Sequence, residues 1–147
     1  GGEPKGRTRI ERESGFTDAL EALNKPHERL TIEQSMLSIS DITQWLNNHI
    51  LPSKKTLVFV TNQWALKSVY NALQSYETVI PKQVGLLGFN NTDWTDLPVK
   101  SISTIVEPVY EEGYAACKML LKRIKDSSLE PEHKLLTCKL NWLKSTI

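Results

Sequence analysis

Neutral hydrogen-bonding side chains gather where three strand-like stretches of the chain come to an end. They are found in Gln34-Ser35-Met36, Thr61-Asn62-Gln63 and Asn90-Asn91. Amides and hydroxyls both donate and accept hydrogen bonds, and none of these side chains titrates near neutral pH. This pattern favours the binding of a polar, uncharged ligand over acid–base catalysis.

The sequence contains no recognisable catalytic motif: it has no G-x-S-x-G, no phosphate-binding loop, no G-x-G-x-x-G and no H-E-x-x-H. His27, His49 and His133 are widely separated, and we expect His49 to be packed or half-exposed on a helix rather than a ligand. Cys117 and Cys138 stand in no metal-type spacing, and their apolar neighbours favour buried free thiols over a disulfide. We therefore predict neither an enzyme nor a site for a metal or a cofactor.

The charge of the chain is balanced, with 18 lysines and arginines against 17 aspartates and glutamates. A net charge of +1 gives this segment no general reason to bind nucleic acid or an anionic membrane. Arg7, Arg9 and Arg12 are interleaved with glutamates, which favours a solvated helix start over an RNA or phosphate patch. The length of 147 residues suits one α/β domain. No signal peptide opens the chain, and no apolar run is long enough to cross a bilayer.

Helical and strand patterns alternate along the first part of the chain. Apolar residues at helical spacing predict a helix over 16–23, and a short strand is predicted over 28–33. Asp41, with Gln44 three positions on, predicts the capped start of an amphipathic helix that Pro52 ends.

Two continuous apolar runs, 56–61 and 84–89, predict strands that are buried on both faces of a sheet. The helix between them has its apolar stripe at Ala65, Leu66, Val69, Leu73 and Tyr76. A strand, a helix and a strand joined by short connections form a βαβ unit, so the predicted fold class is α/β with a mostly parallel sheet flanked by helices. Ligands of such sheets bind outside the carboxyl ends of the strands.

The last third of the chain predicts a loop, a strand, a long helix and a final strand. The loop over 90–100 contains Trp94, a large aromatic residue in polar surroundings, and a strand over 102–106 follows. Pro108 starts the helix, whose first turn is acidic and whose last turn is basic, as the helix dipole favours. Its apolar stripe consists of Val109, Gly113, Ala116, Cys117, Leu120, Leu121 and Ile124. The final strand lies near 134–140.

Five segments, in order along nearly the whole chain, resemble motifs of the LacI/GalR (lac repressor) family of bacterial transcription regulators. They are Arg12-Glu13-Ser14-Gly15-Phe16 with Ala19-Leu20, Thr61-Asn62 with Ala65, Ile80 to Asn91, Ile102-Ser103-Thr104-Ile105 with Glu107-Pro108 and Gly113, and Lys144-Ser145-Thr146. They are similar, in that order, to the family's R-x-x-G-F...A-L, N-D-x-x-A-x-G, V-P-x-D-[IV]-x-[VI]-x-G-[FY]-D-[DN], L-T-T-[IV]-x-Q-P-x-x-x-x-G and R-x-S. Each motif alone is weak, but together their order and spacing are specific.

The resemblance implies the fold of type I periplasmic binding proteins, in which two α/β lobes close on a small effector. This chain would supply essentially one lobe, the C-terminal one, from about 1–106 and a final strand at about 134–143, without the DNA-binding head. In the family, effector binding shifts a hinge between two states and so changes the spacing of paired DNA-binding heads. The implied protein is a cytoplasmic homodimer with no membrane contact, which binds a sugar or sugar acid and, through a domain outside this chain, operator DNA.

Matching positions in the family imply a set of effector-binding residues. They are Thr8, Arg12, Met36, Thr61, Asn90 and Glu107. Asn90 stands where the family has an aspartate, so a charged acceptor is lost and a donor gained, which leaves room for a sugar acid. Glu107 matches a glutamine at the hinge.

The resemblance also implies contacts with partners beyond this chain. Leu66, Trp94, Leu97 and Pro98 match segments that pair two subunits, although Leu66 is equally well explained as a core residue. The helix over about 108–126 packs on the N-terminal lobe in the family and would lack that partner here. It therefore packs differently, exchanges with a second copy, or belongs to a longer chain.

Two other classes of protein fit parts of the sequence. A solute-binding protein of a sugar uptake transporter shares the fold. Such proteins generally lack the V-P-x-D...G-F-D-N motif, which residues 80–91 resemble. A small flavodoxin-like enzyme or receiver domain requires a phosphate-binding loop or an acidic metal pocket, and the sequence contains neither. The predicted function is thus the sensor module of a transcription regulator.

Overall fold

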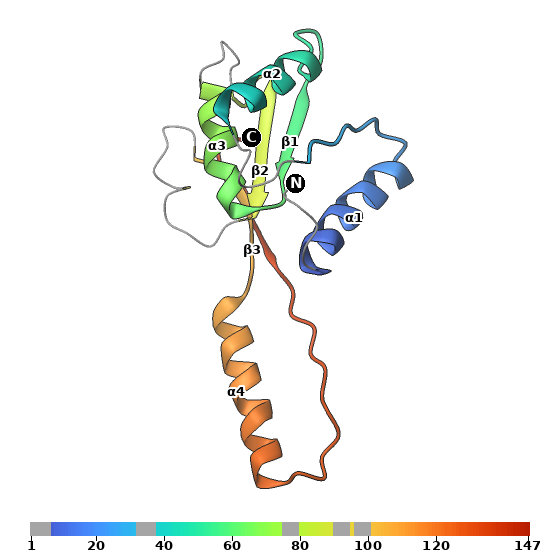
Figure 1. The fold of residues 1–147 in the computed structure, drawn as a ribbon, viewed down its shortest axis with the longest axis vertical. Helices are drawn as coiled ribbons and strands as arrows, with labels where there is room; N and C mark the ends of the chain where they lie inside the picture. The colour runs from blue at the N-terminus through green and yellow to red at the C-terminus, as the bar shows by residue number, and fades with distance from the viewer. Residues whose placement is uncertain (1–6, 32–37, 75–79, 90–94, 96–100) are drawn as a thin grey trace.

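A four-stranded sheet lies at the centre of the computed structural model (Figure 1), which describes residues 7–31, 38–74, 80–89, 95 and 101–147. The strands are, in spatial order, β1 (Thr56–Val60), β2 (Val84–Phe89), β3 (Ser103–Val106) and β4 (Lys139–Asn141). The first three are parallel, and β4 pairs antiparallel with β3. The predicted α/β fold with a mostly parallel sheet is confirmed.

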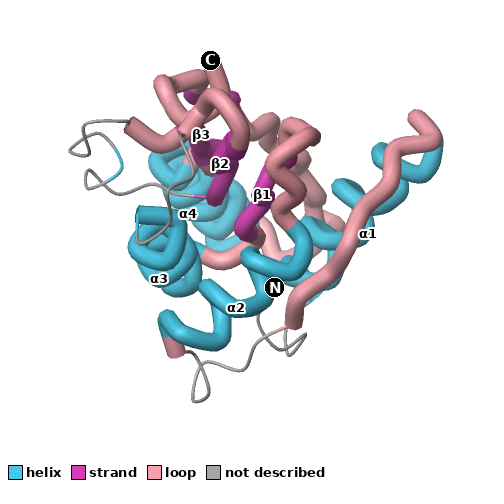
Figure 2. Tube along the Cα trace, turned by 90° about the horizontal axis from the view of Figure 1, so that it is seen from above, coloured by secondary structure: helices cyan, strands magenta, loops and turns pink. Residues whose placement is uncertain are grey.

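Two helices, α2 (Ile39–His49) and α3 (Gln63–Gln74), cover one face of the sheet (Figure 2). The most deeply buried side chains between them and the sheet are Ile42 and Leu46 of α2, Leu66 and Leu73 of α3, and Val84 and Leu86 of β2. Each of these six side chains is exposed by 1% or less. The apolar stripes of both helices thus meet the apolar strands in one core layer.

Two local predictions in the first part of the chain were wrong. Residues 28–31 of the strand predicted over 28–33 are mostly exposed and pair with no strand, and 32–33 lie outside the described residues. Helix α2 begins earlier than predicted, because Ser38 and not Asp41 is its N-cap: the Ser38 hydroxyl accepts a hydrogen bond from the Asp41 amide at 3.0 Å. Asp41 lies in the first turn, where its carboxylate stabilises the positive end of the helix dipole.

The opposite face of the sheet is only partly covered by the described residues, although both β1 and β2 were predicted to be buried on both faces. Leu57 of the edge strand β1 is 50% exposed, whereas β2 is buried along most of its length. Helix α1 (Arg7–Ala22) reaches this face at the carboxyl end of β1. There the Phe16 ring stacks on the Phe59 ring with centroids 4.3 Å apart.

The C-terminal segment is tied to the sheet by Ser145, which is fully buried. Its hydroxyl donates to the Leu86 carbonyl at 2.6 Å and accepts from the Ser103 amide at 2.8 Å. Its backbone amide donates to the Ser101 carbonyl at 2.9 Å, and its carbonyl accepts from the Leu86 amide at 3.0 Å. One serine thus joins β2 to β3.

We expect Ser145→Ala to lower the free energy of unfolding by about 1–3 kcal/mol, because the buried Ser103 amide loses its acceptor. Denaturant unfolding measures the change. Ser14→Ala on the exposed side of α1 is the matched control and should change stability by less than about 0.5 kcal/mol. Equal stabilities of the two variants would show that the Ser145 hydroxyl is not a structural bridge.

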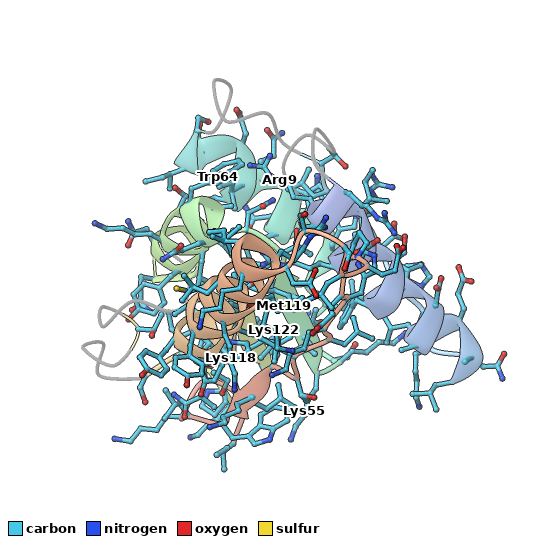
Figure 3. The ribbon with its side chains drawn as sticks, turned by 90° about the horizontal axis from the view of Figure 1, so that it is seen from below. Arg9, Lys55, Trp64, Lys118, Met119 and Lys122 are labelled. Carbon is cyan, nitrogen blue, oxygen red and sulfur yellow. The ribbon has the colours of Figure 1, made fainter. Side chains whose placement is uncertain are left out.

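Helix α4 (Val109–Lys125) projects from the sheet together with the segment that returns to β4 (Figure 1). Pro108 is its N-cap, and its first and last turns are acidic and basic, as predicted. Seen from below, the labelled side chains of Lys118, Met119 and Lys122 lie on this projecting helix (Figure 3). The apolar stripe is exposed, with exposed fractions of 56% for Val109, 60% for Leu120, 53% for Leu121 and 70% for Ile124. What covers this stripe stays a prediction.

The two cysteines are free, as predicted, but they are exposed rather than buried. Cys117 lies on α4, whose stripe has no covering layer among the described residues, and Cys138 lies in the segment returning from α4. The prediction of burial was wrong because apolar neighbours in the sequence do not bury a side chain where no other layer covers it.

Candidate functional site

The Arg12 side chain joins the carboxyl ends of the three parallel strands. Its Nη1 donates to the carbonyl of Thr61, directly after β1, at 3.4 Å. Its Nη2 donates to Oε1 of Glu107, directly after β3, in an ion pair. The guanidinium carbon lies 4.1 Å from the centroid of the Phe89 ring, at the end of β2. The Arg12 side chain of α1 therefore contacts Thr61, Phe89 and Glu107, which are far apart in the sequence.

An aromatic cluster supports the guanidinium on the side of the sheet that faces α1. The ring centroids of Phe59 and Phe89 are 5.9 Å apart at an interplanar angle of 52°, and Phe16 stacks on Phe59. The negative face of an aromatic ring attracts a cation, so Phe89 stabilises the charge of Arg12. None of these three phenylalanines was predicted from the sequence as a site residue. Their positions could have indicated such a role, because Phe89 is the last residue of its strand and Phe59 the last but one.

The ion pair between Arg12 and Glu107 is half-buried, with side chains that are 19% and 32% exposed. Burial lowers the pKa of Arg12, and the positive charge of Arg9 lowers it further. The nearby Cys138 and Glu112 act on this pKa in the opposite direction. Arginine remains a cation in proteins, so the contact is an ion pair at neutral pH.

Two buried nitrogen atoms near the start of α3 have no hydrogen-bond partner among the described residues. They are Nδ2 of Asn62 and Nε1 of Trp64. Asn62 begins the helix through its backbone carbonyl, which accepts from the amides of Ala65 and Leu66 at 3.2 Å each. Because buried donors are nearly always paired, these groups are suited to bind an oxygen atom that lies outside the described residues.

Three of the six predicted effector residues, Arg12, Thr61 and Glu107, come together in this site. Thr8 is exposed on α1, one turn before Arg12 and so on the same side of the helix. Met36 and Asn90 lie outside the described residues. The arrangement presents a cation, a carboxylate and an aromatic face, which suits binding of a polar ligand.

The predicted dimer residues fall in two places. Trp94, Leu97 and Pro98 lie outside the described residues. Leu66 is exposed by 0% and packs in the core, so its side chain has no surface left for a partner subunit. The core interpretation of Leu66 is therefore the one that the fold supports.

Two hollows in the described surface lie along α4, away from the strand ends. A groove of about 350 Å³ runs along α4, and a smaller one of about 130 Å³ lies between α4 and the returning segment. Both reflect the uncovered surface of α4. Among the described residues, no cluster of His, Cys, Asp and Glu could hold a metal ion. Nor, within the same residues, is any helix both long and apolar enough to span a membrane.

The chain is similar to known proteins along almost its whole length. The sequence pattern of the periplasmic binding protein-like domain matches residues 1–146. The HTH-type transcriptional regulator KdgR of Bacillus subtilis (strain 168) is 23% identical over 149 residues, which cover 88% of this chain and 44% of the regulator. The ribose operon repressor of Escherichia coli (strain K12) is 27% identical over 86 residues, which cover 58% of this chain and 26% of the repressor.

A solved structure extends the similarity to three dimensions. It is a LacI family transcriptional regulator from Enterococcus faecium with bound ribose, with a TM-score of 0.72 and 27% identity. The match covers 94% of this chain and 51% of that one. The chain therefore spans about half or less of the proteins that it resembles.

Proposed function

We propose a function for this chain from the family to which it belongs. It is a periplasmic binding protein-like domain, and its relatives are LacI-type regulators, as the five sequence motifs predicted. The chain is the effector-binding part of a bacterial transcription regulator, and its effector is a sugar or a sugar acid. The observation that carries this proposal is the convergence of Arg12 with Thr61, Phe89 and Glu107 at the carboxyl ends of the strands. Ligands of parallel α/β sheets bind at this edge.

The chemistry of the site supports a polar ligand of this kind. Arg12 offers a planar set of N–H donors, and Glu107 offers carboxylate oxygens that accept from hydroxyl groups. Phe89 lies against the guanidinium and holds Arg12 at the strand ends. The structure of the Enterococcus faecium relative contains bound ribose, which is a sugar.

The relatives favour a regulator over a transport protein or an enzyme. KdgR and the ribose operon repressor both act in transcription. In the proposed protein, operator DNA is bound by a domain outside this chain, and two copies pair through surfaces that include the loop with Trp94, Leu97 and Pro98. Such a regulator acts in the cytoplasm and carries out no reaction on its effector.

Thermal unfolding of the full-length protein against neutral sugars, sugar acids and sugar phosphates tests this function. An effector at about 100 times its dissociation constant should add roughly 2.7 kcal/mol of stability. For a domain of this size the midpoint should rise by roughly 5 to 10 °C. If no sugar-like compound shifts the midpoint, the carbohydrate effector is ruled out.

A further inference from the structure

We propose that the ion pair between Arg12 and Glu107 is a latch. It holds the α4 unit, which is α4 with the segment that returns from it (residues 108–138), in one orientation relative to the sheet. The inference goes beyond the proposed function, because it concerns the protein without a ligand and does not depend on what the effector is. It gives Glu107 a positioning role that depends on its charge.

The two connections of the α4 unit leave the sheet at the same level. The ladder between β3 and β4 ends with the pair of Val106 and Lys139. Glu107 follows this pair on one side and Cys138 precedes it on the other, and neither residue belongs to a strand. The unit projects from the sheet at this point (Figure 1). A few backbone torsions there can therefore turn the whole unit without breaking the pairing of the strands, as in a hinge.

Packing among the described residues leaves the orientation of the α4 unit open. Ala115 is the one buried residue of α4, and the apolar stripe of this helix is uncovered in the described part of the chain. The ion pair between Lys122 and Glu132, at 3.0 Å, joins α4 to the returning segment and not to the sheet. The unit is thus tied within itself, and an interaction that reaches the sheet is needed to fix its direction.

Arg12 supplies such an interaction, because its guanidinium is anchored on the sheet side of the hinge. Nη1 donates to the Thr61 carbonyl after β1, and the group lies over the Phe89 ring at the end of β2. Nη2 donates to the Glu107 carboxylate beyond the end of β3. The pair is half-buried, so water and dissolved salt weaken it less than they weaken an exposed pair.

The backbone at Glu107 passes this restraint on to α4. Pro108, the next residue, is the N-cap of the helix, and the Glu107 carbonyl accepts a hydrogen bond from the Val109 amide at 2.9 Å. A residue before a proline has few allowed backbone conformations. Holding the Glu107 side chain therefore limits the directions in which α4 can begin. The similar family motif has a glutamine at this position, so the charge that makes the ion pair belongs to this chain.

The distance between two spin labels in the full-length protein without ligand tests the latch. Lys67→Cys labels the exposed side of α3, and Lys125→Cys labels the far end of α4, about 25 Å from the hinge. Cys117→Ser and Cys138→Ser remove the two thiols of this chain. We expect one narrow distance distribution while the ion pair is present. Glu107→Gln should give a broader distribution or a second distance, because the far end of α4 magnifies a small rotation at the hinge.

Hydrogen exchange measures the strength of the latch without labels. The Val109 amide, which is bonded to the Glu107 carbonyl, reports opening at the hinge. Glu107→Gln should speed its exchange roughly tenfold, which corresponds to about 1.4 kcal/mol, because an uncharged amide pairs less well with a guanidinium than a carboxylate does. Glu112→Gln is the matched control, since it removes the same charge from the first turn of α4 and should change the rate by no more than about twofold.

A double-mutant cycle separates the ion pair from other roles of its two side chains. If Arg12 and Glu107 act through each other, Arg12→Gln combined with Glu107→Gln should loosen the hinge no more than either substitution alone. Additive effects of the two substitutions would overturn the latch. Unchanged label distances and exchange rates in folded Glu107→Gln would overturn it as well.

Glu107→Asp is the second variant at the hinge, in case Glu107→Gln does not fold. It keeps the charge, but its shorter side chain holds the carboxylate farther from Nη2 of Arg12, so the label distances should again broaden. Unchanged distances in this variant would also contradict the latch. No effector takes part in these measurements, so their failure would leave the proposed function standing.

Discussion

Arg12→Ala is expected to weaken effector binding by roughly 100-fold. A hydrogen bond from a charged donor contributes about 1.5–3 kcal/mol, so two such bonds to the ligand contribute at least about 3 kcal/mol, which corresponds to two powers of ten in affinity. The substitution also removes the ion pair between Arg12 and Glu107 at this edge of the sheet. Titration of the full-length protein with the effector found in the thermal screen measures the change.

Arg7→Ala is the matched control for this experiment. Arg7 lies on the same helix, but its side chain is 91% exposed and pairs with Glu11 at 2.6 Å, away from the strand ends. Its removal should leave the affinity within about a factor of two, because exposed ion pairs contribute little. An Arg12→Ala variant that is folded and binds as tightly as Arg7→Ala would show that the effector does not touch this guanidinium.

Leu66→Ala is expected to lower the free energy of unfolding by about 2–5 kcal/mol, which is the range for a leucine removed from a fully buried position. The loss should not depend on protein concentration, because the side chain packs within one chain. Lys67→Ala, on the exposed side of the same helix, should change stability by less than about 0.5 kcal/mol. If the loss in free energy of unfolding instead grows as the protein is diluted, Leu66 lies at a subunit interface.

Gly88 provides an independent check of the packing around Leu66. A Cβ atom at Gly88 would lie 2.7 Å from both methyl carbons of Leu66, so Gly88→Ala alone should cost about 1–3 kcal/mol by overpacking. In the double variant Leu66→Ala and Gly88→Ala the clash disappears and part of the cavity is filled. The combined loss should therefore be smaller than the sum of the two single losses, as expected for residues in contact.

The local structure follows closely from the sequence where short-range physics decides it. The continuous apolar runs over 56–61 and 84–89 form β1 and β2, and Pro108 with its acidic first turn starts α4. The resemblance to family motifs also predicted Arg12, Thr61 and Glu107 for one site, and the three residues contact one another at the strand ends. These features depend on periodicity, capping and position in a motif, all of which can be read along the chain.

Capping and burial were predicted less well, because they depend on competing partners. Ser38 and Asp41 are both good N-cap residues, and the backbone conformation at Ser38 decides between them. Cys117 was predicted to be buried, yet it is exposed on α4, whose apolar stripe is uncovered among the described residues. An apolar stripe shows which side of a helix is to be covered, but not whether the covering layer belongs to the same segment of chain.

The sequence by itself determined the order of the elements, the α/β class and the residue types at the strand ends. Only the tertiary structure placed Arg12 against Glu107, which is 95 positions away, and laid the guanidinium over Phe89. It likewise buried Leu66 in the core and used Ser145 to join two strands. The physical reason is that local conformational preferences act over a few residues, whereas ion pairing and burial are decided by whatever the completed sheet brings within reach.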